Sequence, residues 1–378
     1  MNGRPKPGLR LNAPTRNYER CATHSTDLLS MIQSVKIVSA SEPDQAAVDM
    51  FSRRDLLFGL AATGAVATER RVAAVPDTDV LAPAPINFRV PPGACDCHVH
   101  VFCDPRKFPL SPDRPYTPPP APIEELRRVL RVLHMDRAVI VSPAVYGGSN
   151  DCTLDAVRRF GSGARGIALL TLQTSSAERQ KLRQGGIRGL RLNFETFGIT
   201  DPQTAIDRFR LASQVAAEQA WHVQINTRLP VVEALEEHIL SGAVTVVFDH
   251  FAQAQAALGT DQPGFAALVR LLKAGRAYVK LSAAYRISTR QPDYADATPL
   301  AQALIAASPQ RILWGSDWPH PDAAPRTDRR ATDLRPPLSV DDGRVLNQLA
   351  VWAPDSALRH AILVENPARL YGFEQNRS

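Results

Sequence analysis

The segment GACDCHVHVF (residues 93–102) combines the apolar character of a buried strand with two histidines, His98 and His100. Successive side chains of a strand alternate between its faces, so Asp96, His98 and His100 are expected on one face. The Cα atoms of the two histidines would then lie roughly 7 Å apart, within reach of one ion or one substrate atom. A pair of hydrogen-bonded core histidines would have the same pattern. Only the rest of the chain distinguishes such a structural pair from one that binds an ion or a substrate.

Seven further apolar segments follow, separated by stretches that are expected to be helices. They are RAVIVSPA (137–144), ARGIALLTL (164–172), GIRGLRLNF (186–194), WHVQINT (221–227), AVTVVFDH (243–250), AYVKLSA (277–283) and RILWGSDWPHP (311–321). Eight strands that alternate with helices predict an α/β fold, a parallel sheet closed into a (β/α)8 TIM barrel. We expect one barrel domain at residues 86–373 and a short tail at 374–378.

The leader, residues 1–85, has the features of an export signal followed by a proline-rich lead. Arg53 and Arg54 precede an apolar run at 56–67 that ends in Ala-Val-Ala. This arrangement is typical of the twin-arginine route, and the run is too short for a permanent membrane span. We therefore expect translation to start at Met50 and the protein to reach the periplasm. Without a working signal it would be cytoplasmic.

Composition and charge restrict the class of partner. Hydrophobic residues make up 44% of the 378-residue chain and charged residues 22%, as in globular proteins with a sizeable core. The formal net charge of +6 is spread without a basic run, which argues against a nucleic acid partner. Cys95 and Cys97 are expected to be buried thiols. An oxidising compartment would permit a disulfide among these two, Cys103 and Cys152, but the spacing selects no pair.

Polar side chains gather where the predicted strands end. His98 and His100 follow the first strand, Ser142 the second, Arg191 and Asn193 the fourth, Asn226 the fifth, Asp249 and His250 the sixth, Ser282 the seventh and Asp317 the eighth. In barrels of this class the loops at the C-terminal ends of the strands form the active site. The shared location predicts a functional pocket at that end.

The residue types suit hydrolysis of an ester or amide, which needs an activated water and a polarised carbonyl. Asp317 is in position to accept the proton of the water. His98, His100 and His250 could polarise the carbonyl or hold a divalent ion that does so. An isolated aspartate would more often be a helix N-cap, but its three histidine companions favour catalysis by Asp317.

Four motifs together resemble the amidohydrolase superfamily, in its amidohydrolase-related (amidohydrolase 2) branch. They are His98-x-His100, VFDH with His250, WGSDWPH with Asp317, and ENPARLYGF at 365–373. Within the branch, the segments DCHVHVF, RPYTP, GIRGLRLNF, WHV and WGSDWPHP are most similar to 2-pyrone-4,6-dicarboxylate lactonase and related lactone hydrolases. The resemblance implies a hydrolase that opens a carboxylate-bearing lactone, with Asp317 as the general base.

One departure from the family bears on the metal. Metal-dependent members place a histidine at the end of the fifth strand, where this chain has Asn226. The metal-independent lactonase also lacks a histidine at this position. His222 lies about 13 Å toward the opposite end of the barrel and is expected in the core. The resemblance therefore favours a site without a metal or other cofactor. If zinc or another divalent ion binds, the expected ligands are His98, His100, His250 and Asp317.

The resemblance also implies substrate contacts. Positions that bind a dicarboxylate in the lactonase match Arg191, Arg286 and Tyr116, whereas a further arginine of the lactonase aligns with Phe197. Arginine suits a carboxylate because its fork donates two parallel hydrogen bonds, although a structural ion pair is the ordinary alternative. Further candidates for substrate contact are Asn226, Asn193, Ser142, Ser282 and His320.

Two other functions stay open from the sequence. The first is a metal-dependent, zinc-containing amidohydrolase or decarboxylase. The second is an exported barrel that binds a sugar acid or an aromatic ligand without catalysis. The preferred partner is a small acidic lactone, and the sequence predicts neither a nucleic acid partner nor a stable membrane span.

Overall fold

The computed structural model describes residues 83–171, 174–324 and 328–374, so the predicted export signal lies outside the described residues. Eight parallel strands pair in sequence order and form one barrel. The strands are β1 (Cys95–Val99), β2 (Arg137–Val141), β3 (Ala164–Ala168), β4 (Ile187–Asn193), β5 (His222–Asn226), β6 (Val246–Phe248), β7 (Ala277–Ser282) and β8 (Ile312–Gly315). All eight predicted strands are present, and the (β/α)8 fold is confirmed.

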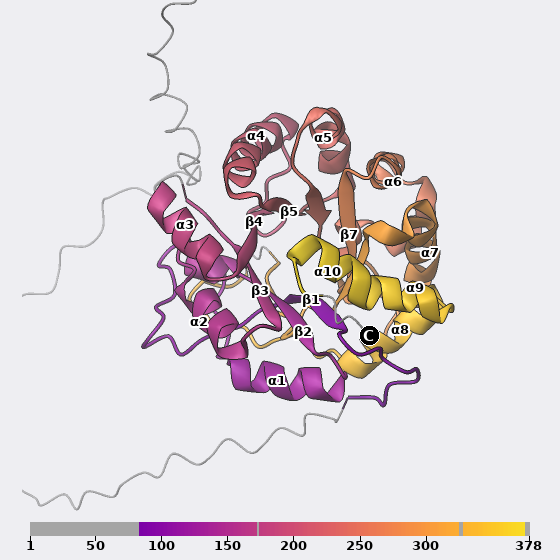
Figure 1. The fold of residues 1–378 in the computed structure, drawn as a ribbon, viewed down its shortest axis with the longest axis horizontal. Helices are drawn as coiled ribbons and strands as arrows, with labels where there is room; N and C mark the ends of the chain where they lie inside the picture. The colour runs from indigo at the N-terminus through magenta and orange to yellow at the C-terminus, as the bar shows by residue number, and fades with distance from the viewer. Residues whose placement is uncertain (1–82, 172–173, 325–327, 375–378) are drawn as a thin grey trace, which may run out of the picture. The chain divides into compact units, whose positions relative to one another are not determined.

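Helices surround the strands (Figure 1). They are α1 (Ile123–Val132), α2 (Asp151–Phe160), α3 (Ser176–Gln184), α4 (Pro202–Gln219), α5 (Leu229–Ser241), α6 (Phe265–Lys273), α7 (Thr298–Ala307), α8 (Asp342–Trp352), α9 (Ser356–His360) and α10 (Asn366–Tyr371). Within the described ranges, no helix is long and apolar enough to cross a membrane.

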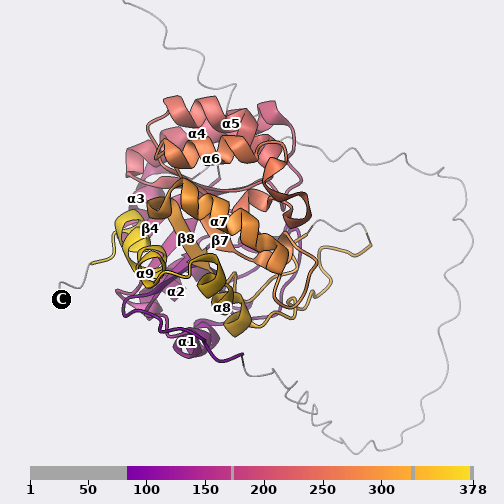
Figure 2. The ribbon, with the colours of Figure 1, turned by 90° about the vertical axis from the view of Figure 1, so that its right-hand side faces the viewer.

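The end of the barrel where the strands begin is closed by α10 and the residues after it. In Figure 1, α10 lies across this end of the barrel, and Figure 2 shows α9 on the same side. Asn366 of α10 donates a hydrogen bond to the carbonyl of Ile312, at the start of β8. Tyr371 and Phe373 pack against the apolar residues inside the barrel, which include Cys95 and Cys97, both of them buried free thiols as expected. A substrate must therefore enter at the opposite end.

β1 departs from the strict alternation that its sequence predicts. Its register with β2 shifts between Asp96 and Val99, and Cys97 packs inside the barrel whereas Val99 packs in the outer layer. Asp96 Oδ1 accepts hydrogen bonds from the backbone amides of His98 at 3.1 Å and Ser316 at 3.0 Å. Burial raises the pKa of Asp96 to about 7. A bulge of this kind re-aims side chains, and here it lets both histidines of the motif reach one point.

β8 packs so closely against β1 that no side chain fits between the two strands at Gly315. A Cβ atom on Gly315 would lie 2.8 Å from the backbone nitrogen of His98. Beyond it, the amide of Asp317 donates to the carbonyl of His98 at 2.9 Å, and the amide of His100 donates to the carbonyl of Trp318 at 2.7 Å. The Trp-Gly-Ser-Asp segment thereby completes the barrel and places a carboxylate beside the two histidines.

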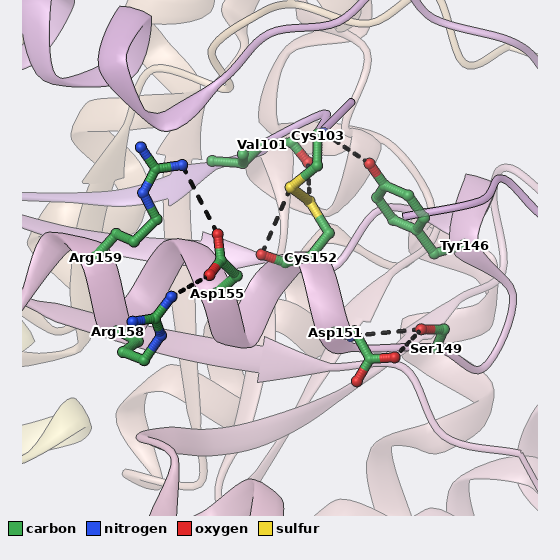
Figure 3. Close-up of a disulfide and its surroundings, with 9 residues drawn as sticks. All are labelled: Val101, Cys103, Tyr146, Ser149, Asp151, Cys152, Asp155, Arg158 and Arg159. Atoms are coloured by element: carbon green, nitrogen blue, oxygen red, sulfur yellow. Dashed lines mark hydrogen bonds and ion pairs between the residues drawn. A yellow bond between two sulfur atoms is a disulfide. The ribbon is translucent and has the colours of Figure 1, made fainter. Parts of the chain in front are cut away.

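The loop after β1 is tied to α2 by a disulfide between Cys103 and Cys152 (Figure 3). The amide of Cys103 also donates a hydrogen bond to the hydroxyl of Tyr146 at 2.8 Å. The same loop carries Tyr116, which lines the cavity at the barrel mouth. The disulfide thus fixes the root of a loop that forms part of the cavity wall.

Candidate active site

A cavity of about 540 Å³ opens at the C-terminal ends of the strands. Eight of the predicted site residues line it: His100, Tyr116, Arg191, Asn193, Asn226, His250, Arg286 and Asp317. His98 lies beneath the cavity floor and is fully buried. The structure therefore brings the predicted catalytic residues together from β1, from β6 and its following turn, and from the segment after β8.

Three imidazoles converge on one oxygen of Asp317. The Nε2 atoms of His100, His98 and His250 lie 3.4, 3.6 and 4.0 Å from Asp317 Oδ1. Neither Asp317 Oδ1 nor His98 Nε2 has a hydrogen-bond partner among the described residues, although both atoms are buried. The centre of the site is thus a cluster of electron-rich atoms.

The hydrogen-bond partner of each Nδ1 atom determines whether Nε2 of the same imidazole carries a proton or a lone pair. His100 Nδ1 lies 2.8 Å from the carbonyl of Val141, and because a carbonyl only accepts, Nδ1 carries the proton. His98 Nδ1 lies 3.1 Å from the carboxylate of Asp249, which favours the same tautomer, and 3.2 Å from the ammonium of Lys280, which favours the opposite one. Nε2 of His100 therefore presents a lone pair toward Asp317, and Nε2 of His98 does so when its Nδ1 donates to Asp249. Nδ1 of His250 faces a hydroxyl instead, and its tautomer stays open.

This donor set fits a divalent cation. Lone pairs on imidazole nitrogens and a carboxylate oxygen repel one another unless a proton or a metal ion lies between them. Three imidazole nitrogens and one carboxylate oxygen are a typical four-coordinate zinc set, and histidine ligands that donate their other N–H to a carboxylate or carbonyl are typical of metal sites. Asn226 is not needed for this set, because its amide bonds to Asn193 at 3.0 Å and Gln253 at 3.1 Å. The metal-free site that the sequence favours stays a prediction.

The second oxygen of Asp317 is held by two neighbours on the turn after β7. Oδ2 accepts hydrogen bonds from the hydroxyl of Tyr285 at 2.7 Å and from Nε of Arg286 at 2.9 Å, with Nη2 of Arg286 at 2.8 Å. Burial by itself raises the pKa of Asp317, but Arg286 and the imidazoles outweigh it and hold that pKa well below its usual range. Asp317 is therefore ionised, and Oδ1 is the oxygen left to accept a proton. Arg286 thus forms an ion pair with Asp317, which is the structural alternative to a substrate contact.

A second carboxylate supports His98 from below. Asp249 Oδ2 accepts from Arg191 Nε at 3.3 Å and from Gln224 Nε2 at 3.1 Å. Its Oδ1 faces His98 and the ammonium of Lys280, each at a distance of 3.1 to 3.2 Å. Burial raises the pKa of Asp249, but the neighbouring cations outweigh this and keep it well below the usual range. Arg191 thus forms one buried ion pair, while its two Nη atoms donate no hydrogen bond to the described residues.

Three residues predicted to contact substrate do not line the cavity. Ser282 lies behind His250, with its hydroxyl 2.9 Å from Nδ1. His320 lies behind Tyr285, with Nδ1 3.2 Å from the tyrosine hydroxyl. Ser142 is fully buried at the end of β2. These residues follow the ends of strands and therefore lie near the site, but their side chains do not point into the cavity.

Sequence reasoning missed three residues of the site, Tyr285, Gln224 and Lys280. Lys280 carried a signal, because a lysine in the middle of the apolar segment AYVKLSA has no place in a buried strand unless it is paired. Gln224 has the same parity along β5 as Asn226 and therefore faces the barrel interior with it. Tyr285 gave no comparable signal, since it follows the strand in a turn.

Comparison with known proteins identifies the family of the chain. The chain matches the family model described as Amidohydrolase over residues 95–373. It is 36% identical over 292 residues to the 4-sulfomuconolactone hydrolase of Rhizobium radiobacter, covering 76% of this chain and 93% of the relative. It is 32% identical over 302 residues to the 2-pyrone-4,6-dicarboxylate hydrolase of Comamonas testosteroni, covering 78% and 94%. An apo structure from Agrobacterium tumefaciens, 27% identical, superposes with a TM-score of 0.65 over 76% of this chain and 99% of that one. The chain belongs to the amidohydrolase family.

Proposed function

We propose that the protein hydrolyses a lactone that carries one acidic substituent. The observation that carries this proposal is the arrangement of Asp317, whose Oδ2 is clamped while Oδ1 faces three imidazoles at the base of a cavity. The relatives named as lactone hydrolases, with carboxylate or sulfonate groups in the named substrates, support the substrate class.

Asp317 is the general base of the proposed reaction. Its Oδ1 takes a proton from water, the water oxygen attacks the lactone carbonyl carbon, and the ring C–O bond then breaks. The proton on Asp317 passes to the leaving alkoxide, which yields a hydroxy acid. His250 can donate from Nε2 to the carbonyl oxygen when the hydroxyl of Ser282 donates to its Nδ1. Clamping Oδ2 serves this chemistry because it leaves a single oxygen to exchange the proton.

The charges at the base of the cavity, around Asp249 and Asp317, favour an anionic group there. Arg191, Lys280 and Arg286 pair with Asp249 and Asp317, so this cluster carries one positive charge in excess when the histidines are neutral. The rest of the lining adds Arg228 and the carboxylates of Glu195, Asp296 and Asp322, so the positive excess is confined to the base of the cavity. The free Nη atoms of Arg191 can hold an acidic group in the cavity. Tyr116, another buried residue of the cavity lining, is a further donor for it.

The number of acidic groups follows from a missing arginine. Where the dicarboxylate-binding lactonase has a further arginine, this chain has Phe197, which is 51% exposed in the loop after β4. An exposed phenylalanine offers no counter-ion for a second acid. A substrate with one acidic substituent therefore fits the cavity better than a dicarboxylate.

Replacing Asp317 by asparagine is expected to lower kcat for an acidic lactone by roughly 10²- to 10⁴-fold, because the amide cannot accept the proton of water. Acid release in a pH-stat measures the reaction directly. The matched control is Asp296→Asn, which removes another carboxylate that lines the cavity and should leave kcat nearly unchanged. Full activity in Asp317→Asn would remove this residue from catalysis. Ligand binding by a wild-type protein that hydrolyses no lactone would favour the non-catalytic barrel.

Replacing Arg286 by methionine is expected to shift the acid limb of kcat/KM toward higher pH. Arg286 lowers the pKa of Asp317, so its loss raises that pKa and the base becomes protonated at a higher pH than in the wild type. Profiles between pH 4 and pH 9 measure the shift. The control Arg228→Met removes a cavity-lining arginine that pairs with Glu195 instead. An unchanged acid limb together with a raised KM for acidic lactones alone would assign Arg286 to substrate binding.

His98, His100, His250 and Asp317 would hold a divalent cation, which when bound supplies polarisation of the carbonyl and a lowered pKa of water. We expect chelator-treated protein to bind one zinc ion per chain in a calorimetric titration, with weaker binding by His250→Asn. The control His222→Asn alters a buried histidine whose ring meets that of Tyr371 edge-on in the barrel interior, with 5.4 Å between ring centroids. Absence of zinc binding, with lactone hydrolysis unaffected by chelation, would support the metal-free site that Asn226 suggests.

We also propose export by the twin-arginine route. The motif at Arg53 and Arg54 motivates it, and the disulfide between Cys103 and Cys152 supports it, since such bonds persist in oxidising compartments. Lysine at both arginine positions should retain the protein in the cytoplasm with these two cysteines reduced. Cell fractionation with thiol labelling measures both outcomes. Unchanged export of the double-lysine variant would refute the route.

A further inference from the structure

A strained turn follows β6 and carries two side chains of the cavity wall. The φ values are 50°, 56°, 53° and 54° at His250, Phe251, Ala252 and Gln253, none of which is glycine. Left-handed backbone is unfavourable for residues with a Cβ atom, and where surrounding contacts enforce it, it clusters at functional sites. Phe251 and Ala252 are fully buried, whereas His250 and Gln253 line the cavity. The turn therefore presents Gln253 to the same space as the reaction centre.

Gln253 begins an amide chain of three side chains, which continues through Asn226 to Asn193. Its Nε2 donates to Asn226 Oδ1 at 3.1 Å, and Asn226 Nδ2 donates to Asn193 Oδ1 at 3.0 Å. Asn193 and Asn226 are paired at the ends of β4 and β5, and β5 pairs with β6. The amide chain thus crosses the ends of three neighbouring strands, and all three of its residues line the cavity.

The direction of the amide chain is fixed by the backbone. The amide of Thr196 donates to Asn193 Oδ1 at 3.3 Å, and a backbone N–H can only donate. Asn193 therefore turns its oxygen toward Thr196, and Asn226 must meet this oxygen with its nitrogen. The oxygen of Asn226 is then left for Gln253, which can approach it only with Nε2. One backbone contact thus orients all three side chains.

The two ends of the amide chain have no hydrogen-bond partner among the described residues. Gln253 Oε1 is a free acceptor at one end, and Asn193 Nδ2 is a free donor at the other, two residues from Arg191. Both atoms are accessible in the cavity. An acidic substituent held by Arg191 can also accept from Asn193. The oxygen of Gln253 would repel an acidic group, so its complement is a donor, and a hydroxyl group supplies one.

We propose that Gln253 selects a lactone that carries a hydroxyl group in addition to the acid, with the hydroxyl donating to Oε1. The inference rests on the proposed function and narrows its substrate class. The monolactone of a sugar diacid has one carboxylate and free hydroxyl groups, and so complements both ends of the amide chain. A lactone acid without hydroxyl groups offers Gln253 no donor. Gln253 acts in substrate binding and takes part in no bond-making step.

Lactones with the same ring test this selection. The γ-lactone of 2-hydroxyglutarate has one carboxylate and no hydroxyl group, and the γ-lactones of the stereoisomeric trihydroxyglutarates add two hydroxyl groups. Wild-type kcat/KM, measured by acid release, should be at least about 10-fold higher for one of the hydroxylated lactones, because the other lactone leaves Oε1 unpaired. Gln253→Leu should lower kcat/KM for that lactone and abolish the preference. The control Gln255→Leu changes an exposed glutamine of the cavity lining outside the amide chain and should preserve it.

The outcomes separate this inference from the proposed function. A wild type that hydrolyses the hydroxyl-free lactone as efficiently as every hydroxylated one would overturn the selection while the proposed hydrolysis stands, and this arm needs no variant. An equal loss for both kinds of lactone in Gln253→Leu would also overturn it. Hydrolysis of none of these lactones would count against the proposed function, and calorimetric titration then decides the selection. Binding of a hydroxylated lactone that Gln253→Leu weakens would support it, and binding of none would overturn it.

Discussion

The site depends on two backbone hydrogen bonds that join β1 to the segment after β8. The amide of Asp317 donates to the carbonyl of His98, and the amide of His100 donates to the carbonyl of Trp318. These bonds form only because Gly315 lets the two segments approach without a Cβ atom. Asp317 and two of the histidines around it are thus held by the closure of the barrel itself. Asp317 adopts a φ of 66°, a conformation that costs of order 1–3 kcal/mol and persists where surrounding contacts enforce it.

Charge is arranged in two tiers around this closure. Asp317 with Arg286 forms the upper tier at the cavity, and Asp249 with Lys280 and Arg191 forms the lower tier. Each carboxylate is kept ionised by cations, and burial strengthens each interaction because water does not screen it. His98 lies between the two tiers, with Nδ1 facing Asp249 and Nε2 facing Asp317. Burial lowers the pKa of His250 to about 4, so this ring is neutral near neutral pH.

The sequence predicted the features of the fold that depend on hydrophobic periodicity and on the order of the elements along the chain. Eight apolar segments identified the strands, and polar residues at their ends identified the cavity end of the barrel. Directions of side chains beyond the strands were not predictable. The bulge between Asp96 and Val99 depends on a carboxylate that accepts from a residue more than two hundred positions away, Ser316, and no local pattern encodes that contact. Arg286 matched a substrate-binding position, yet its partner within the chain is Asp317, which only the folded turn after β7 reveals.

The closed base of the barrel has a consequence for turnover. Tyr371 and Phe373 fill the end opposite the cavity, so substrate and product pass through the same mouth. Opening a lactone creates a new carboxylate, and the product therefore leaves with one more negative charge than the substrate brought in. In the proposed reaction it must separate from Arg191 and from the excess positive charge of the cluster around Asp249 and Asp317. Electrostatic retention of the product would make its release sensitive to ionic strength, and that step would then limit the rate in dilute salt.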